Sequence, residues 1–354
     1  MKFMVIGLGQ CGGRVADEFV RLDNRAHENR GFQILTGAFA LDTDSSSLKG
    51  LTSIKSDQQR MVIGEAKTRG HGVGKDSALG AEIARDEGFK IVDTIRKTRR
   101  FDQTDVFLLV GGIAGGTGSG TLPVVAQQLK ERYADRAVYV VAVLPFEHEE
   151  SIDPIFADNT ASCLKAIQPV ADAVFLIDNE RYIKKEVSWR DNIGEINRMI
   201  VEPFYNLLCA GEETKAKHVG VTSLEISDIL KTLSGWTAIG YGKADLPLIT
   251  MPWDKPRDEI QKGTKAMDEA VSELSISCHP KDAAGAIYLV SAPPEEIGIS
   301  LIKYMGEYLR SIAPDATIRY GDYPYEKGLI DVTLVLSGLK EVEKVTAYLA
   351  RTAA

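Results

Sequence analysis

Residues 106–121 constrain the possible folds of this 354-residue chain more than any other stretch. The apolar run Val106–Val110 predicts a buried strand, and it leads into a loop of glycines and hydroxyl side chains that opens a helix over Leu122–Arg132. Backbone N–H groups at a helix N-terminus favour anions, because they have no partner inside the helix and the helix dipole is positive there. The pattern therefore predicts a phosphate-binding loop, with hydroxyl donors from Thr117, Ser119 and Thr121.

Strands and helices alternate from Met1 to about residue 179. The expected strands are Lys2–Ile6, Ile34–Leu41, Val106–Val110, Ala137–Leu144 and Ala173–Ile177, and helices such as Arg14–Leu22 and Ala78–Glu87 fall between them. This alternation predicts an α/β fold, with a Rossmann-like parallel sheet covered on both faces and ligands at the carboxyl ends of its strands. We expect this N-terminal domain to cover residues 1–190.

The rest of the chain changes in character. A long central helix is expected over residues 191–213, because apolar residues recur there at helical spacing, and Pro203 should kink or break it. A smaller α+β domain is expected over residues 214–354. Its strands should be Ile287–Val290, Thr317–Tyr320 and Leu329–Ser337, its helices should lie near Glu295–Ile312 and Glu341–Arg351, and Leu246–Arg257 should be a loop.

Composition narrows the class of partner. The net charge of −8 argues against nucleic acid, so a bound phosphate would be held by backbone and hydroxyl groups rather than by a basic patch. The four cysteines are scattered without paired spacing, which supports neither zinc nor disulfides. The sequence contains neither a signal peptide nor an apolar run long enough to span a membrane, and we expect a cytoplasmic protein.

A second glycine motif, Gly7–Gly13, follows the first expected strand and matches G-x-G-x-x-G. Alone it would indicate a dinucleotide-binding domain, and hence an NAD-dependent oxidoreductase. The acidic residue that should follow after about 20 positions is poorly supplied, because Asp42 lies well beyond that spacing. A third glycine-rich element, Thr68–Gly74, has no place in such a domain.

Together the three loops resemble the tubulin/FtsZ superfamily. Gly115–Gly120 (Gly-Gly-Thr-Gly-Ser-Gly) is similar to the tubulin signature loop, Gly9–Gly12 resembles tubulin's first phosphate loop, and Gly-His-Gly-Val-Gly at 70–74 is most similar to the archaeal CetZ group. The resemblance implies the tubulin/FtsZ fold and a cytoskeletal GTPase that assembles head to tail with itself into filaments, with a role in cell shape. It also implies that GTP or GDP is the ligand and that Mg²⁺ is bound through the phosphates.

The resemblance carries a set of nucleotide-binding residues. They are Gly9, Gln10, Cys11, Gly12, Gly13, Arg14, Asp42, Gly72, Val73, Gly74, Gly115, Gly116, Thr117, Gly118, Ser119, Glu149, Asn179, Ile193 and Asn197. Glu149 would bind the ribose, and the amides of Asn179 and Asn197 would read the edge of guanine. The sequence departs from the family at Ile193, where an aromatic residue is usual, and at Asp153, where an arginine is usual. A larger residue at Gly12 or Gly118 is expected to abolish binding without unfolding the chain.

Catalysis is expected from Glu225 and Asp228. On a helix that starts near them, Ile226, Ile229, Leu230 and Leu233 would form the buried stripe, and the acidic pair would project from the other side. The pair resembles the acidic residues that, in the superfamily, complete the active site of the next subunit in a filament. This implies a GTPase that assembly activates. Thr222-x-x-Glu225 is equally a capping box. A GTP-binding scaffold with weak hydrolysis and the oxidoreductase remain alternatives.

Overall fold

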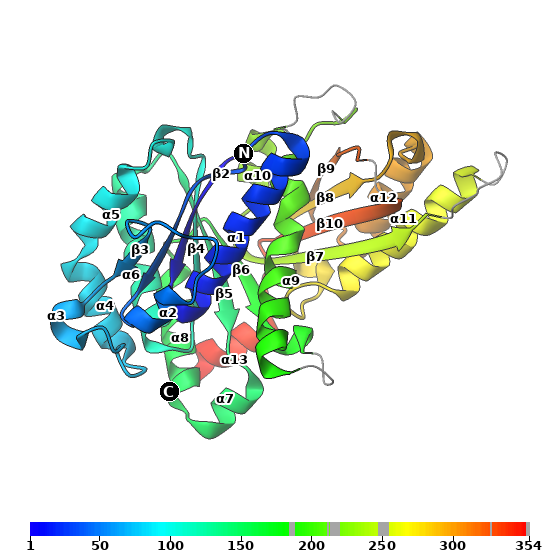
Figure 1. Cartoon of the computed structure of the whole chain (residues 1–354). Helices are drawn as coiled ribbons and strands as arrows, with labels where there is room; N and C mark the ends of the chain where they lie inside the picture. The colour runs from blue at the N-terminus through cyan, green and yellow to red at the C-terminus, as the bar shows by residue number, and fades with distance from the viewer. Residues whose placement is uncertain (184–187, 211, 213–219, 247–254, 326–327, 352–354) are drawn as a thin grey trace. The chain divides into compact units, whose positions relative to one another are not determined.

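The computed structural model describes residues 1–183, 188–210, 212, 220–246, 255–325 and 328–351 (Figure 1). The chain divides into two compact units. Unit 1 consists of Met1–Val201 and Glu343–Ala354, and unit 2 consists of Glu202–Val342. The α/β class, with a parallel-sheet N-terminal part and a mixed α+β C-terminal part, is confirmed.

Parallel strands form the sheet of unit 1, and their order is β3-β2-β1-β4-β5-β6. Their bounds are β1 Phe3–Leu8, β2 Leu35–Asp42, β3 Arg60–Val62, β4 Val106–Gly112, β5 Ala137–Leu144 and β6 Ala173–Asp178. The direction of winding reverses between β1 and β4, which lie side by side in parallel. In open α/β sheets ligands bind in the crevice at such a reversal, outside the carboxyl ends of the strands.

Helices cover this sheet and place their N-termini at that crevice. The helices of unit 1 are α1 Gly9–Arg30, α2 Ser45–Lys49, α3 Glu65–Thr68, α4 Ser77–Asp86, α5 Gly88–Arg96, α6 Gly116–Arg132, α7 Glu147–Ile152, α8 Ile155–Ile167 and α13 Glu343–Arg351, with short 3-10 turns at Phe101–Gln103 and Asn179–Tyr182. Helix α1 packs on β1, β2 and β4, whereas α6 packs on β1, β4 and β5. Right-handed crossovers that wind in opposite directions put α1 and α6 on opposite faces, and Figure 1 shows α1 crossing in front of the strands.

Strand burial explains why the sequence pattern was easy to read in unit 1. All the residues of β1 and β6 are buried, as are Val106–Gly111 of β4 and Val138–Leu144 of β5. Strands covered on both faces need continuous apolar runs, and these runs are the ones seen in the sequence.

The central helix is α9, Trp189–Cys209, and it contains Pro203. Of the two outcomes expected at Pro203, a kink or a break, the break does not occur, because the helix continues to Cys209. Phe204, Leu207 and Leu208, which follow the proline, are almost completely buried. Their burial holds the last turns in place although the proline lacks an N–H group. Residues 211 and 213, at the end of the expected helix, lie outside the described residues.

Unit 2 contains a mixed sheet in the order β7-β10-β8-β9, in which β10 is antiparallel to β7 and β8 and parallel pairing joins β8 to β9. The strands are β7 Gly235–Asp245, β8 Gly285–Ser291, β9 Thr317–Asp322 and β10 Leu329–Ser337. The helices are α10 Ile226–Thr232, α11 Lys255–Ser272 and α12 Ile299–Ile312, with 3-10 turns at Pro280–Asp282 and Pro294–Glu296.

Three features of the C-terminal half differ from the sequence expectation. Strand β7 and helix α11 were not predicted, and residues 255–257 of the expected loop are helical, while residues 247–254 lie outside the described part. Helix α13 belongs to unit 1, where it packs on α8. Its Lys344 lies 2.8 Å from the Asp178 carboxylate at the end of β6. The compact units therefore differ from the three expected domains, since the last helix returns to the N-terminal unit.

Candidate functional site

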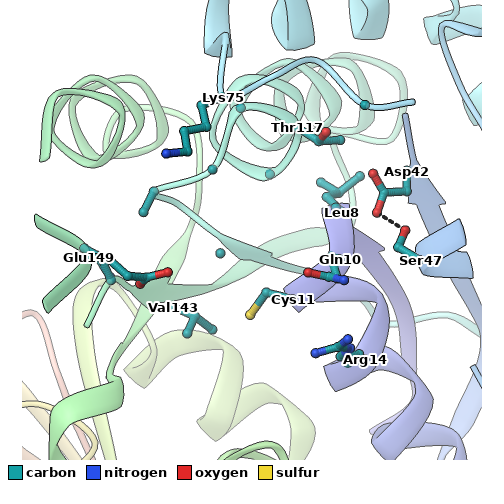
Figure 2. A pocket seen from close by; sticks show the side chains of 18 of the residues that line it. Leu8, Gln10, Cys11, Arg14, Asp42, Ser47, Lys75, Thr117, Val143 and Glu149 are labelled. Atoms are coloured by element: carbon teal, nitrogen blue, oxygen red, sulfur yellow. Dashed lines mark hydrogen bonds between the residues drawn. The ribbon is translucent and has the colours of Figure 1, made fainter. Parts of the chain in front are cut away.

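A pocket of about 600 Å³ lies in unit 1 at the carboxyl ends of β1 and β4 (Figure 2). It is lined by the first turns of α1 and α6, by the loops around residues 42–47, 71–75 and 143–149, and by one side of α9. Its volume is in the range of small-molecule sites. Most of the residues predicted to bind nucleotide therefore converge, although they come from segments far apart in the sequence.

Two helix N-termini meet in this pocket. Helix α1 begins at Gly9 and α6 begins at Gly116, and neither has a side chain that caps its first N–H groups. A Cβ added to Gly9 would lie 3.0 Å from the backbone nitrogen of Gly118, so the two first turns are in close contact. Both helices thus point free N–H groups and the positive ends of their dipoles at one place. Backbone N–H groups arranged in this way favour an anion.

Gly12 and Gly118 have a different role from the one predicted. A Cβ on Gly12 would lie 2.1 Å from the Val110 carbonyl oxygen, and one on Gly118 would lie 2.3 Å from the Gly112 carbonyl oxygen. These glycines let α1 and α6 pack tightly on β4. A larger residue at Gly12 or Gly118 would disturb this packing, so a loss of stability is expected in addition to the predicted loss of binding. Gly12 and Gly13 do not line the pocket, whereas Gly9, Gly115, Gly116 and Gly118 do.

Of the three hydroxyl groups expected as phosphate donors, only that of Thr117 lines the pocket. Helix α6 starts earlier than predicted, at Gly116, so Ser119 and Thr121 lie inside it. Ser119 donates to the Gly115 carbonyl and Thr121 donates to the Thr117 carbonyl at 2.8 Å. The assignment of Ser119 as a ligand-contacting residue is therefore not supported by its place in the structure. The Thr117 hydroxyl lies 2.7 Å from that of Thr43, on the next loop.

The loops after β2 and β3 are joined by backbone hydrogen bonds beside the α6 N-terminus. Ser45 N–H donates to the Gly70 carbonyl at 3.0 Å, and Gly72 N–H donates to the Thr43 carbonyl at 3.0 Å. This pairing brings Gly72, Val73 and Gly74 to the pocket wall.

Two acidic side chains, at the end of β2 and on the loop after it, also line the pocket. Asp42 is 3% exposed and accepts hydrogen bonds from the Ser47 hydroxyl and, at 3.2 Å, from the N–H of Asp44. Burial raises the pKa of Asp42, and these hydrogen bonds only partly oppose that effect. Hydrogen bonds from the hydroxyl and the N–H of Ser46 lower the pKa of Asp44.

The other end of the pocket is suited to a planar base. Asn179 is buried, and its Nδ2 donates to the Leu144 carbonyl at 3.0 Å, while its Oδ1 has no hydrogen-bond partner among the described residues. Buried polar atoms are rarely left in this state, so Oδ1 is available to accept from a ligand N–H group. Asn197 on α9 is also buried and lines the pocket. Ile193 and Ile196 form an apolar wall beside it.

Glu149, Gln10, Cys11 and Arg14 complete the lining (Figure 2). One oxygen of Glu149 accepts from Phe146 N–H at 2.9 Å, which fixes the carboxylate at the start of α7 and leaves its other oxygen for a ligand hydroxyl. Burial raises the pKa of Cys11 to about 12, although nearby Arg14 opposes this. The cysteine is therefore a neutral thiol at physiological pH and fits a small lining residue rather than a nucleophile.

Lys75 is a charged pocket residue that sequence reasoning missed, as it missed Asp44, Ser47, Phe156 and Ile196. Its Nζ lies 3.4 Å from an Asp153 oxygen and 4.2 Å above the Phe156 ring, at the edge of the pocket. Lys75 directly follows the glycine-rich element Thr68–Gly74, and no motif in the sequence distinguishes it from other lysines. The sequence feature that could have led to Lys75 is Asp153, at a position where an arginine is usual in the family. A carboxylate beside an anion site needs a cation near it, and Lys75 is that cation.

The predicted catalytic pair lies in unit 2. Glu225 is exposed and precedes α10, which begins at Ile226, so the expected capping box with Thr222 does not form. The Asp228 carboxylate lies 3.3 Å from the Arg319 guanidinium on β9. Ile229 and Leu233 are buried as expected, but Ile226 is 38% exposed and is not part of a buried stripe.

No group of three or more His, Cys, Asp or Glu side chains is arranged to hold a metal ion within the ranges that the structure covers. The helices that are described include none long and apolar enough to cross a membrane.

Comparison with known proteins identifies the family. Residues 2–185 match the GTPase domain of the Tubulin/FtsZ family, and residues 187–354 match the C-terminal domain of tubulin-like CetZ proteins. The chain belongs to the tubulin/FtsZ family, in its CetZ group. The glycines of the first loop are therefore part of a GTPase domain, which leaves the dinucleotide-binding alternative without support.

Individual relatives agree over nearly the whole length. Tubulin-like protein CetZ1 of Haloferax volcanii is 31% identical over 98% of this chain and 90% of its own. Among solved structures, GDP-bound monomeric CetZ1 from Haloferax volcanii superposes with a TM-score of 0.85 at 29% identity, covering 99% of this chain and 98% of the other. A GTPγS-bound protofilament of CetZ2 from the same organism gives a TM-score of 0.87 at 27% identity, covering 100% and 98%.

Proposed function

We propose that this chain binds GTP in the pocket between α1 and α6, assembles head to tail into filaments, and hydrolyses GTP where the next subunit completes the site. One observation carries the binding step: two uncapped helix N-termini converge at one end of a pocket whose other end holds the unpartnered Oδ1 of Asn179. A nucleotide with an anionic tail and an N–H-bearing base satisfies both ends. The similar CetZ structures with GDP and GTPγS support this proposal.

Guanine is the base that this arrangement favours. Its N1–H and N2–H donors match a buried amide oxygen, whereas adenine has an acceptor at N1 and would leave Asn179 Oδ1 unpaired. An unsatisfied buried polar group costs about 1–3 kcal/mol, which is enough to separate GTP from ATP by roughly tenfold or more. The free oxygen of Glu149 is suited to a ribose hydroxyl.

Hydrolysis requires a group that the pocket itself does not provide. The carboxylates in the described lining have other partners in this proposal: Asp42 accepts from Ser47 and Asp44 from Ser46, while Glu149 accepts from Phe146 with one oxygen and would meet the ribose with the other. We infer that Asp228, assisted by Glu225, is delivered by the neighbouring subunit and positions the attacking water. Mg²⁺ would be held through the phosphates and would neutralise part of their charge.

Assembly would then control activity. A head-to-tail contact repeats without closing, so subunits form filaments, and we extend the proposal to a role of these filaments in cell shape. Phosphate release from GTP, measured against protein concentration with light scattering in parallel, tests the proposal. The rate per subunit should rise with concentration as scattering rises. A rate per subunit that is independent of concentration would show that one chain holds a complete active site.

A filament scaffold with slow hydrolysis is the second candidate. It is favoured by Ile193, which lines the base end of the pocket without an aromatic ring for stacking, and by the ion pair that holds Asp228 to Arg319. A scaffold would form nucleotide-dependent filaments with negligible phosphate release in the same assay.

A further inference from the structure

Lys75 occupies a backbone conformation that lysine disfavours. Its φ is +67°, and among the described residues only Arg69 shares a positive φ without being glycine. The same loop uses glycine at three other positive-φ positions, Gly70, Gly72 and Gly74. Glycine would adopt this conformation at lower cost, so the lysine at position 75 calls for an explanation from its side chain.

The surrounding structure fixes this conformation firmly. Asn159 is 5% exposed, and its Nδ2 donates to the carbonyl of Lys75 at 2.9 Å and to that of Ala114 at 3.0 Å. This buried amide ties the Lys75 backbone to the segment that leads into α6. On the other side the Lys75 backbone abuts Gly116, where a Cβ would lie 2.6 Å from the Lys75 carbonyl carbon. The lysine is therefore anchored directly beside the α6 N-terminus.

The charges of the pocket explain what the side chain could do there. The described lining carries two cations, Arg14 and Lys75, against the three carboxylates Asp42, Asp44 and Glu149. A nucleoside triphosphate adds several negative charges, which the helix N-termini offset only in part. The Lys75 ammonium is held by contacts that are easily exchanged, namely a 3.4 Å ion pair with the half-exposed Asp153 and a stack on Phe156.

We propose that Lys75 is a phosphate-binding residue of this pocket, held by Asp153 and Phe156 until the anionic tail of a nucleotide draws its ammonium across. Asn159 is the positioning residue, because it holds the Lys75 backbone against the start of α6. This inference rests on the proposed nucleotide-binding function and adds to it a cation supplied by the loop after β3. Figure 2 shows Lys75 at the upper edge of the pocket, with Thr117 to its right and Glu149 below it.

The test compares Lys75→Gly, Lys75→Met, Asp153→Asn and the control Lys90→Ala. Lys90 pairs with Glu87 on α5 and does not line the pocket. Binding of GTPγS, GDP and guanosine is measured by calorimetry, together with the Tm of each nucleotide-free protein. Lys75→Gly and Lys75→Met should lose about 10- to 100-fold in affinity for GTPγS, less for GDP, and almost nothing for guanosine. Lys75→Gly should also keep or raise the Tm, because glycine relieves the positive φ.

Asp153→Asn separates ligand binding from a structural salt bridge. It frees the ammonium, so affinity for GTPγS should stay equal or rise, whereas a purely structural ion pair would make Asp153→Asn as harmful as Lys75→Met. Equal losses in those two variants, or GTPγS affinity in Lys75→Gly that matches Lys90→Ala, would overturn the assignment of Lys75. Failure of the unaltered protein to bind GTPγS would instead overturn the proposed function itself.

Discussion

Gly115 offers a way to block the phosphate site without disturbing the fold. It precedes α6 in an extended conformation, with φ −79° and ψ 168°, and it lines the pocket. A Cβ added there meets no atom within 4 Å. A β-branched side chain tolerates this backbone conformation, so Gly115→Val places its methyl groups in open space at the pocket wall. Gly118→Ala is the matched comparison, because its single added carbon is directed at the Gly112 carbonyl oxygen.

The structure predicts different losses of stability for Gly118→Ala and Gly115→Val. At Gly118 the added carbon would lie 2.3 Å from Gly112 O and 3.2 Å from Leu8 O, so α6 must shift on β4. Overpacking of this kind costs about 1–3 kcal/mol, or roughly 2–12 °C in Tm. At Gly115 the free energy of unfolding should change by no more than about 0.5 kcal/mol. If its methyl groups displace phosphate from one charge-assisted N–H contact, affinity should fall by about 1.5–3 kcal/mol, roughly 10- to 160-fold.

Thermal unfolding of the nucleotide-free proteins and calorimetric binding of GTPγS measure the two effects separately. Gly115→Val should keep the Tm and lose affinity, whereas Gly118→Ala should lose both. A Gly115→Val protein that binds GTPγS as tightly as the unaltered chain would refute the placement of the phosphates at the α6 N-terminus.

Further predictions concern the base, the catalytic pair and Asp42. Asn179→Ala should reduce the preference for GTP over ATP by about 1–3 kcal/mol, measured by competition binding, and an unchanged preference would contradict the assignment of Oδ1 as the guanine acceptor. Asp228→Ala should still bind GTP and form filaments while phosphate release falls by about 10²-fold or more, and normal release would contradict catalysis in trans. Burial raises the folded-state pKa of Asp42, so its ionised form weakens folding above that pKa, and this penalty disappears as the pH falls through it. Asp42→Asn should therefore have a higher Tm than the unaltered protein at pH 7 without nucleotide, and the difference should vanish in acid. A difference in Tm that does not change with pH would refute this reasoning.

Unit 1 was predictable because local pattern and tertiary role coincide there. Strands buried on both faces must be continuously apolar, and sharp strand-to-helix turns beside a ligand must be rich in glycine, so both leave direct traces in the sequence. Unit 2 was predicted less well. Strand β7 carries Gly240 and Gly242, which lower its strand propensity. A Cβ on either would lie 2.0 Å from a carbonyl oxygen of α11, so these glycines allow α11 to pack closely on β7. The local sequence does not predict this contact.

The sequence by itself determined the alternating architecture and the three glycine-rich loops, and its family resemblance singled out Asn179 and Asn197, which line the pocket. Only the tertiary structure decided where each side chain points. Ser119 hydrogen-bonds to the backbone of its own helix, because α6 begins three residues before it, at Gly116. Lys75 meets Asp153 across 78 residues of sequence, and its backbone is held by Asn159 from a third segment. Such contacts depend on which loops the order of strands in the sheet brings together. The sequence around each residue does not encode which distant segment will lie beside it.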